Sequence, residues 1–150
     1  MAPTLTACAG FLFAVLWMDL MFDTQAGRGR PESEDSALAS ITGYYRRATT
    51  ESQPMGSLIA LVMVVLLVAL AVEAVVGDAP GWLILLSAVL AGGPIVLALV
   101  RTVPNAVRLG RGAGSPAERT LLARSVLRDH ILCAIGISLF LALWLIRSLN

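Results

Sequence analysis

The chain has 150 residues, of which 57% are hydrophobic and only 14% are charged. Soluble domains carry about 25% charged residues, so this composition excludes an ordinary soluble domain. The formal net charge of +1 excludes the strongly basic surface that marks nucleic-acid-binding proteins. The sequence therefore predicts one compact membrane domain whose first partner is the lipid bilayer and which binds no nucleic acid.

Four apolar segments are long enough to cross a membrane as helices. They cover residues 5–22, 57–76, 81–100 and 131–146. A spanning helix needs about 20 predominantly apolar residues, with about 17 as the lower limit. Each segment must be helical because lipid cannot satisfy the hydrogen bonds of an open backbone. The predicted fold is an all-α, integral membrane four-helix bundle formed by the whole chain.

The basic residues are all arginine, and they lie almost entirely on two connections. Four stand between the first and second apolar segments, six stand between the third and fourth, and only Arg147 lies beyond the fourth. Arginine-rich connections mark the cytoplasmic side of a membrane. We therefore predict a multi-pass protein of a bacterial inner (cell) membrane, with both long connections cytoplasmic and both termini outside.

The first connection is predicted to contain a loop and then a short helix. Residues 24–36 are polar and rich in Gly, Ser, Pro and acid, which is typical of a loop. Apolar residues then recur at helical spacing and predict a short amphipathic helix over residues 36–50, at the inner membrane interface. The simplest interpretation of Tyr44 and Tyr45 in this helix is an aromatic anchor at headgroup level.

The second connection is predicted to be a tight turn on the outer side. Gly77 suits a helix C-cap, Asp78 suits an N-cap, and Pro80 suits the first turn of the next helix. Trp82 and Trp144 are expected in the outer aromatic belt.

The third apolar segment carries Gly92, Gly93 and Pro94 at its middle. Proline frees a carbonyl one turn back and glycine admits a close backbone approach, so we expect a kink packed against a neighbouring helix. The helix is expected to end at residues 103–105. The glycine-rich residues 110–114 then predict a flexible linker.

The fourth helix is predicted to begin well before the membrane. Ser115 and Glu118 match a capping box, with Pro116 at the first helical position. The helix should run from about residue 116 to about residue 147 and project about 20 Å into the cytoplasm.

Polar groups are expected to gather at the cytoplasmic mouth of the bundle. Asp19 and Asp23 lie one helical turn apart at a helix C-terminus, so a cation must reach them from elsewhere, and we expect arginine. A carboxylate, a histidine and an arginine in a partly dry cleft form a general base with an anion-stabilising partner. The candidate catalytic residues are Asp19, Asp129 and His130, and the candidate substrate-binding residues are Trp17, Tyr44, Tyr45, Arg101, Asn105 and Arg128.

A structural interpretation of these groups competes with the catalytic one. An Asp19–arginine pair that only holds the bundle together is an adequate explanation, because ion-pair networks also gather at such places. A di-iron site in a bundle needs two Glu-x-x-His pairs, and His130 is the only histidine, so we predict no metal and no cofactor. Cys8 and Cys133 are expected at opposite depths, too far apart for a disulfide.

Several short motifs occur together along the chain. They are Gly10 in the first helix, Tyr44-Tyr45-Arg46 followed by Pro54, Pro104-Asn105 followed by Arg108-Leu109, and Arg128 followed by His130. This pattern resembles the anthrone-oxygenase-like family of small four-helix membrane proteins, although this chain has acidic residues where the first helix of the family is apolar. The resemblance implies a cofactor-free oxygenase acting on a flat polycyclic phenol, with His130 or Asp19 as the base and Arg101 or Arg128 holding the phenolate.

The residues establish a small multi-pass membrane protein with a polar cluster and leave three classes of function open. An enzyme predicts a closed, ligand-sized apolar pocket with Asp19, Arg128 and His130 at its rim, occupied by a small hydrophobic aromatic ligand. An accessory or assembly subunit predicts that these groups pair with one another and that a membrane protein docks on the chain. A proton-coupled exporter would place its carboxylate near mid-membrane. A homo-oligomer is compatible with each class.

Overall fold

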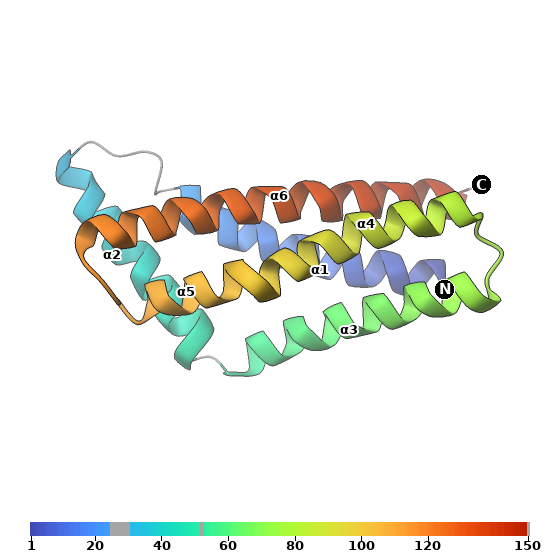
Figure 1. Cartoon of the computed structure of the whole chain (residues 1–150), viewed down its shortest axis with the longest axis horizontal. Helices are drawn as coiled ribbons and strands as arrows, with labels where there is room; N and C mark the ends of the chain where they lie inside the picture. Colours follow the sequence, from blue (N-terminus) through green and yellow to red (C-terminus); the bar gives the residue numbers. More distant parts are fainter. Residues whose placement is uncertain (25–30, 52, 150) are drawn as a thin grey trace.

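The computed structural model describes residues 1–24, 31–51 and 53–149, and it is an all-helical bundle (Figure 1). Its elements are α1 (Ala2–Asp23), α2 (Pro31–Arg46), the π-helix η2 (Arg47–Glu51), α3 (Gln53–Val76), α4 (Gly81–Leu97), the π-helix η3 (Ala98–Thr102), α5 (Val103–Gly110) and α6 (Pro116–Leu149). Four helical segments are long and apolar enough to cross a membrane: Ala2–Asp23, Pro54–Val76, Gly81–Gly110 and Pro116–Leu149. The prediction of a four-helix bundle is confirmed.

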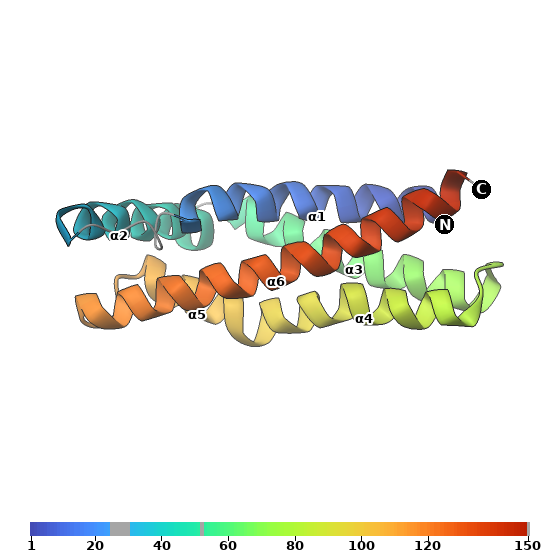
Figure 2. The same cartoon turned by 90° about the horizontal axis from the view of Figure 1, so that it is seen from above.

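The four long helices form a ring in which each packs against two neighbours. Both α1 and α4 lie against α3 and α6, so that α3 and α6 face each other across the diagonal (Figures 1 and 2). The two chain ends lie together at one end of the bundle, beside the turn between α3 and α4. The helix α2 crosses the opposite end, where it lies against α5 (Figure 1).

The core of the bundle is apolar and contains one buried tryptophan. Leu5, Leu66, Phe140 and Trp144 are fully buried between the helices. The Nε1 of Trp144 donates a hydrogen bond of 2.9 Å to Ser87 Oγ. The prediction that Trp144 stands in an outer aromatic belt is therefore wrong, because its indole is satisfied inside the core.

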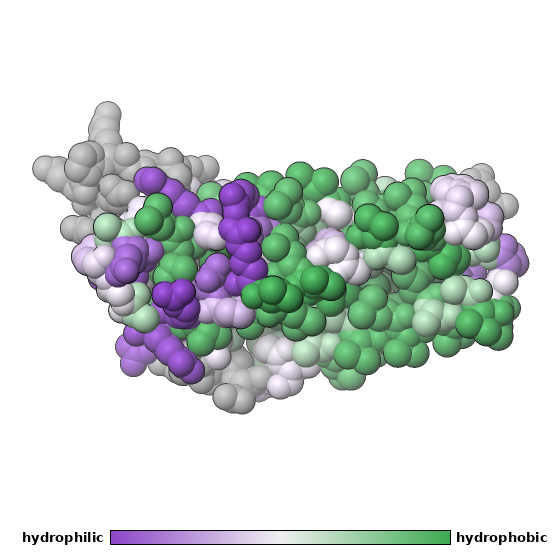
Figure 3. Space-filling model, viewed as in Figure 1, coloured by the Kyte–Doolittle hydropathy of each residue, from purple (hydrophilic) through white to green (hydrophobic). Residues whose placement is uncertain are grey.

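The outer surface of the four long helices is also apolar. Large hydrophobic side chains are exposed along all of them, including Trp82 at 63% exposure. Figure 3 shows this apolar surface along the length of the bundle. On the same face, the hydrophilic residues lie mainly at the α2 end. A helix that is apolar on all sides suits lipid and not water.

The helix α2 is longer and more deeply packed than the sequence suggests. It begins at Pro31, so the loop predicted over residues 24–36 is wrong for its last six residues, while residues 25–30 lie outside the described part of the chain. A second core joins α2 to α5 and to the start of α6 through Leu38, Ile41, Tyr45, Ala106, Leu109, Ala123 and Val126. Tyr45 is therefore a core residue, and its predicted place among headgroups is wrong.

The third apolar segment does not end at residues 103–105. The chain stays helical from Gly81 to Gly110 by passing through the π-helix η3, with Pro104 in the first turn of α5. A Cβ added at Gly92 or Gly93 would contact nothing within 4 Å, so the close approach predicted there is wrong. The close approach lies at Gly136 of α6, where a Cβ would stand 2.7 Å from Pro94 Cγ.

The connections follow the capping predictions only in part. The Ser115–Glu118 capping box is confirmed, since each backbone N–H donates to the other side chain, at 2.7 Å and 3.3 Å. Asp78 is not an N-cap: Pro80 holds that position, and Asp78 Oδ1 pairs with Arg147 Nη2 at 2.7 Å. Gly110 is a packing position and not part of a linker, because its missing Cβ lets α5 lie against the backbone of Tyr45.

Candidate functional site

Asp23 is the most deeply buried polar group at the α2 end of the bundle. It ends α1 and is 1% exposed. Its Oδ1 accepts a hydrogen bond of 2.7 Å from the Tyr45 hydroxyl, and its Oδ2 lies 2.6 Å from His130 Nδ1. Because an ionised carboxylate only accepts, Nδ1 carries the proton in this contact. Both oxygens of Asp23 are thus used, and three helices meet at this one side chain.

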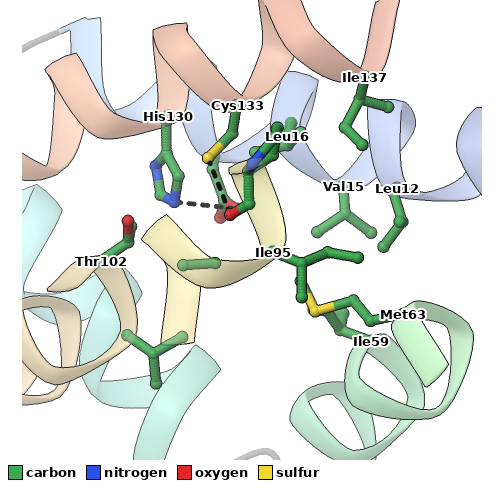
Figure 4. Close-up of a pocket in the computed structure, with 14 residues that line it drawn as sticks. Leu12, Val15, Leu16, Ile59, Met63, Ile95, Thr102, His130, Cys133 and Ile137 are labelled. Atoms are coloured by element: carbon green, nitrogen blue, oxygen red, sulfur yellow. Dashed lines mark hydrogen bonds and ion pairs between the residues drawn. The ribbon is translucent and has the colours of Figure 1, made fainter. Parts of the chain in front are cut away.

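Asp19 lies one turn earlier on α1 and is held more loosely. Its Oδ1 accepts a hydrogen bond of 2.6 Å from the Tyr44 hydroxyl. Its Oδ2 stands 3.7 Å from His130 Nε2, which is beyond hydrogen-bond distance (the dashed line that starts at His130 in Figure 4). The two ring nitrogens of His130 therefore face two different carboxylates.

The consecutive tyrosines of α2 reach the two carboxylates because successive helical residues point about 100° apart. The Tyr44 ring stacks on Phe22 of α1 with 4.1 Å between ring centroids. Burial raises the pKa of Tyr45 well above the ordinary value, and the negative charges of Asp23 and Asp19 raise it further. Burial and the charge of Asp19 raise the pKa of Tyr44 in the same direction. Both phenols therefore stay protonated and serve as donors.

A cavity opens beside Asp19 and His130. Its volume is about 430 Å³, within the range of about 300–1,000 Å³ that is usual for ligand sites. The side chains around it are mostly apolar and come from α1, α2, η2, α3, η3, α5 and α6. A smaller cavity of about 120 Å³ continues from it into the bundle and is also lined by Asp19 and His130. Figure 4 shows His130 facing Ile59 and Met63 of α3 across this space.

The structure separates the arginines from this cavity. Arg101 Nε lies 3.1 Å from Asp129 Oδ2, and Arg128 Nε lies 3.7 Å from Asp129 Oδ1. None of these three residues lines either cavity. Asp129 precedes His130 on α6 and points to another side of the helix. The prediction that arginine compensates Asp19 and Asp23 is therefore wrong, since His130 and the tyrosines do so.

Asp129 is itself unusual among the described residues. It is fully buried, and neither of its carboxylate oxygens accepts a hydrogen bond there. The Nε of Arg101 is close but its N–H does not point at the carboxylate, so this contact is an ion pair without a hydrogen bond. Arg101 instead donates a hydrogen bond of 3.0 Å from Nη2 to Ser125 Oγ. The pair fastens η3 to α6.

Two other predicted site residues also lie away from the cavity. Trp17 is 60% exposed on α1 and turns outward, because its position faces away from the packed side of that helix. Asn105 is half-buried on α5 and lines neither cavity. Tyr44, Tyr45, Asp19 and His130 are the predicted site residues that the structure brings together around the larger cavity.

Asp23 belongs to the site but was not among the candidate site residues predicted from the sequence. Its position one helical turn from Asp19 was the signal for it. The pairing of two acids four apart with two adjacent tyrosines is the pattern that could have found it. Among the described residues, no group of three or more His, Cys, Asp or Glu side chains could hold a metal ion. Cys8 and Cys133 are both free thiols, and Cys133 lines the smaller cavity.

Comparisons with known proteins do not assign this chain to a family. Comparisons with protein-family models, with curated proteins and with solved structures find no match to this chain. The resemblance to the anthrone-oxygenase-like family therefore stays a prediction that rests on the short motifs alone.

Proposed function

We propose that this protein is a multi-pass membrane enzyme that removes a proton from a small lipophilic phenol or from its keto tautomer. One observation carries the proposal: Asp19 Oδ2 and His130 Nε2 stand 3.7 Å apart on the wall of an apolar cavity of ligand size. Two polar atoms at this spacing can hold one ligand oxygen between them. A buried acid and base in an apolar cavity is the usual form of a proton-transfer site.

In this proposal Asp19 is the base and His130 holds the oxygen of the substrate. An imidazolium between two carboxylates gives the trio a net charge of −1, whereas a neutral imidazole would leave −2 in a partly dry place. The charged ring donates from Nε2 to the substrate oxygen and stabilises the negative charge that forms there. Asp19 Oδ2 takes the proton. This assignment replaces the arginine that the resemblance implies for the phenolate.

Asp23 and Tyr45 act as positioning residues. Asp23 binds Nδ1, which fixes the direction of the ring and turns Nε2 toward the cavity. The Tyr45 hydroxyl donates a hydrogen bond to Asp23 Oδ1. Both carboxylate oxygens are then engaged, which fixes the orientation of the carboxylate. Tyr44 does the same for Asp19 Oδ1 and leaves Oδ2 for the substrate.

The resemblance to the anthrone-oxygenase-like family implies that molecular oxygen takes part in the reaction. An anthrone has a CH₂ group whose proton is acidic because the resulting carbanion is also a phenolate-like enolate. The enol tautomer of the anthrone places its O–H between His130 and Asp19, and loss of that proton to Asp19 gives the same anion. The carbon of this anion bonds to O₂ and forms a peroxide anion, which takes the proton back from Asp19. Loss of water from the hydroperoxide then leaves a C=O group. One O₂ is consumed and one water is released for each CH₂ converted to C=O.

We place the protein in a bacterial inner membrane with the α2 end on the cytoplasmic side. The arginines of α2, α5 and the first half of α6 support this orientation through the preference of basic residues for that side. The chain ends and the turn between α3 and α4 then face outward. In this orientation the cavity opens near the cytoplasmic leaflet.

Oxygen uptake tests the proposal directly. The protein in lipid nanodiscs is mixed with 1,8-dihydroxyanthrone, and the loss of O₂ is followed together with the absorbance of the anthraquinone product. We expect catalysed uptake by the wild type and a fall of about 100-fold or more for Asp19→Asn, the usual size of a general-base effect. Asn105→Ala, outside the cavity, is the matched control and should keep full activity. Uptake that is the same with and without protein defeats the proposal.

A second candidate function is favoured by one observation. Asp19 is hydrogen-bonded to Tyr44, and Asp23 is hydrogen-bonded to both Tyr45 and His130, as a purely structural clasp between α1, α2 and α6 requires. A chain with such a clasp suits an accessory subunit of a membrane complex. The clasp predicts that Asp19→Asn lowers stability and changes no binding, whereas the enzyme predicts lost turnover in a protein that still folds.

A further inference from the structure

We infer that the substrate enters the cavity sideways from the lipid, through an opening between α3 and the η3–α5 segment. This inference rests on the proposed function of the same cavity and names the source and the physical class of its ligand. The ligand is an uncharged aromatic phenol that is dissolved in the bilayer. The walls of the cavity, the helix spacing and the character of the rim each support this route.

Most sides of the cavity are closed by packed helices. Val15 and Asp19 of α1 and His130 of α6 form its inner wall, and Ala48 of η2 lies at the end toward α2. These sides are covered because α1 packs directly on both α6 and α3, and because η2 contacts both α3 and α5. The remaining side lies between α3 and the η3–α5 segment.

The helices on that remaining side are held apart. No Cα of α3 comes within 8 Å of a Cα in η3 or α5 among the described residues, whereas α3 and α4 pack directly further along the bundle. Packed helices have their axes about 8–10 Å apart, so their facing Cα atoms approach closely. The backbones of α3 and of the η3–α5 segment are therefore farther apart here than those of α3 and α4, and residues from both segments line the cavity.

The rim of this opening is apolar and exposed. Met55 of α3 is 43% exposed, Leu99 of η3 is 59% exposed, and Val103 of α5 is 50% exposed, and all three line the cavity. Asp19 and His130 are the only ionisable side chains other than the two tyrosines among the described residues that line it. A rim of this kind faces lipid more favourably than water, so an uncharged lipophilic molecule reaches it by diffusion in the bilayer.

Gly56 offers a way to close the opening without disturbing the fold. It lies on α3 in the wall of the cavity, and a Cβ added there would meet nothing within 4 Å. The Cβ of a phenylalanine at this position is therefore unobstructed, and its ring can extend from there toward the opening. Gly93 on α4 has the same free surroundings but lines neither cavity, which makes Gly93→Phe the matched control.

The test measures binding and not turnover. The protein in phosphatidylcholine nanodiscs is mixed with 2-naphthol in a stopped-flow instrument, and association is followed by the naphthol fluorescence. We expect Gly56→Phe to slow association at least about tenfold, as for binding that must wait for a conformational opening, and Gly93→Phe to leave it unchanged. Ala60→Phe, one turn further along the same wall, repeats the test if Gly56→Phe does not fold.

The outcomes separate this inference from the proposed function. Association that is unchanged in both plugged variants, or no binding of 2-naphthol by the wild type, overturns the lateral route. Binding that is slowed by the plug in a protein that consumes no oxygen supports the route and defeats only the proposed reaction. The methyl ether 2-methoxynaphthalene, which cannot donate a proton to Asp19, should bind about tenfold or more weakly than 2-naphthol, because a buried carboxylate oxygen is left unpaired.

Discussion

His130 Nδ1 lies 2.6 Å from Asp23 Oδ2, and this contact joins the end of α1 to the middle of α6. The other oxygen of the same carboxylate accepts the Tyr45 hydroxyl of α2 at 2.7 Å. A single buried carboxylate therefore fixes the position of three helices and the direction of the imidazole. The stability of the α2 end and the chemistry of the cavity both depend on it.

Loss of Asp23 should destabilise the fold more than loss of Asp19. Asp23→Ala leaves the Tyr45 hydroxyl without its carboxylate acceptor and leaves His130 Nδ1 with only the 3.4 Å contact to that hydroxyl. Breaking such a buried pair costs about 3–5 kcal/mol. Asp19→Ala removes one hydrogen bond from half-buried Tyr44 and should cost about 1–2 kcal/mol. Denaturation in detergent, followed by circular dichroism, measures both. Equal losses would show that Asp23 is not the central group.

The buried tyrosine predicts a loss of stability in alkali. The pKa of Tyr45 is raised in the folded protein above its ordinary value of 10.0, so the unfolded chain releases this proton first as the pH rises. The contribution of the Tyr45 hydroxyl to the free energy of unfolding is complete below pH 10. Above pH 10 this contribution falls, by up to about 1.4 kcal/mol per pH unit. Tyr45→Phe should flatten the fall in melting temperature between pH 10 and 11. If the melting temperature of Tyr45→Phe falls as steeply with pH as that of the wild type, the loss of stability in alkali is due to other groups.

Two glycines should resist substitution while a third accepts it. Alanine at Gly110 would place its Cβ 2.8 Å from the backbone of Tyr45 and Arg46, and at Gly136 it would place it 2.7 Å from Pro94 Cγ. Such overpacking costs about 1–3 kcal/mol. Gly43→Ala, where a Cβ meets nothing within 4 Å, should be neutral or should stabilise the helix by up to about 1 kcal/mol. Thermal melts that rank Gly43→Ala with the other two would contradict the helix contacts described above.

The two arginines beside Asp129 should contribute unequally. Arg101 is closer to the buried carboxylate than Arg128 and is less exposed, at 43% against 61% for the side chain. Arg101→Met should lower stability by about 1–3 kcal/mol because it leaves a buried charge poorly compensated, while Arg128→Met should change it by less than about 0.5 kcal/mol. In a double-mutant cycle, Asp129→Asn should remove most of the cost of Arg101→Met. A cost that persists in full would assign it to the Ser125 contact.

Much of the fold could be predicted from the sequence, because it depends on patterns among residues close together in the chain. The four apolar segments, the capping box at Ser115 and the helical spacing in residues 36–50 each depend on neighbours within a turn or two, so the chain itself contains the information. The turn chemistry at Asp78 and the depth of Trp144 did not follow, because each depends on a partner from another helix: Arg147 and Ser87. The same is true of the close packing at Gly136.

The candidate site was predicted in part for the same reason. Asp19 and Asp23 were recognisable as a pair that needed a partner, and His130 was recognisable as the single histidine. Which cation reaches the pair depends on the rotation of α6, and Asp129 and His130 are adjacent residues that face different neighbours. A rotation of about 100° would exchange their roles. No pattern in the sequence determines that angle.

The nitrogen resonances of His130 test the central claim most directly, because this is the only histidine in the chain. The protein is labelled with ¹⁵N-histidine in lipid nanodiscs at neutral pH, and its spectrum is recorded with and without 2-naphthol. We expect both ring nitrogens to be protonated and only the Nε2 resonance to move when 2-naphthol is added, since Nδ1 stays bound to Asp23. A neutral ring with a bare Nε2, or an Nε2 resonance that ignores the phenol, would contradict the role of His130 as the group that holds the substrate oxygen.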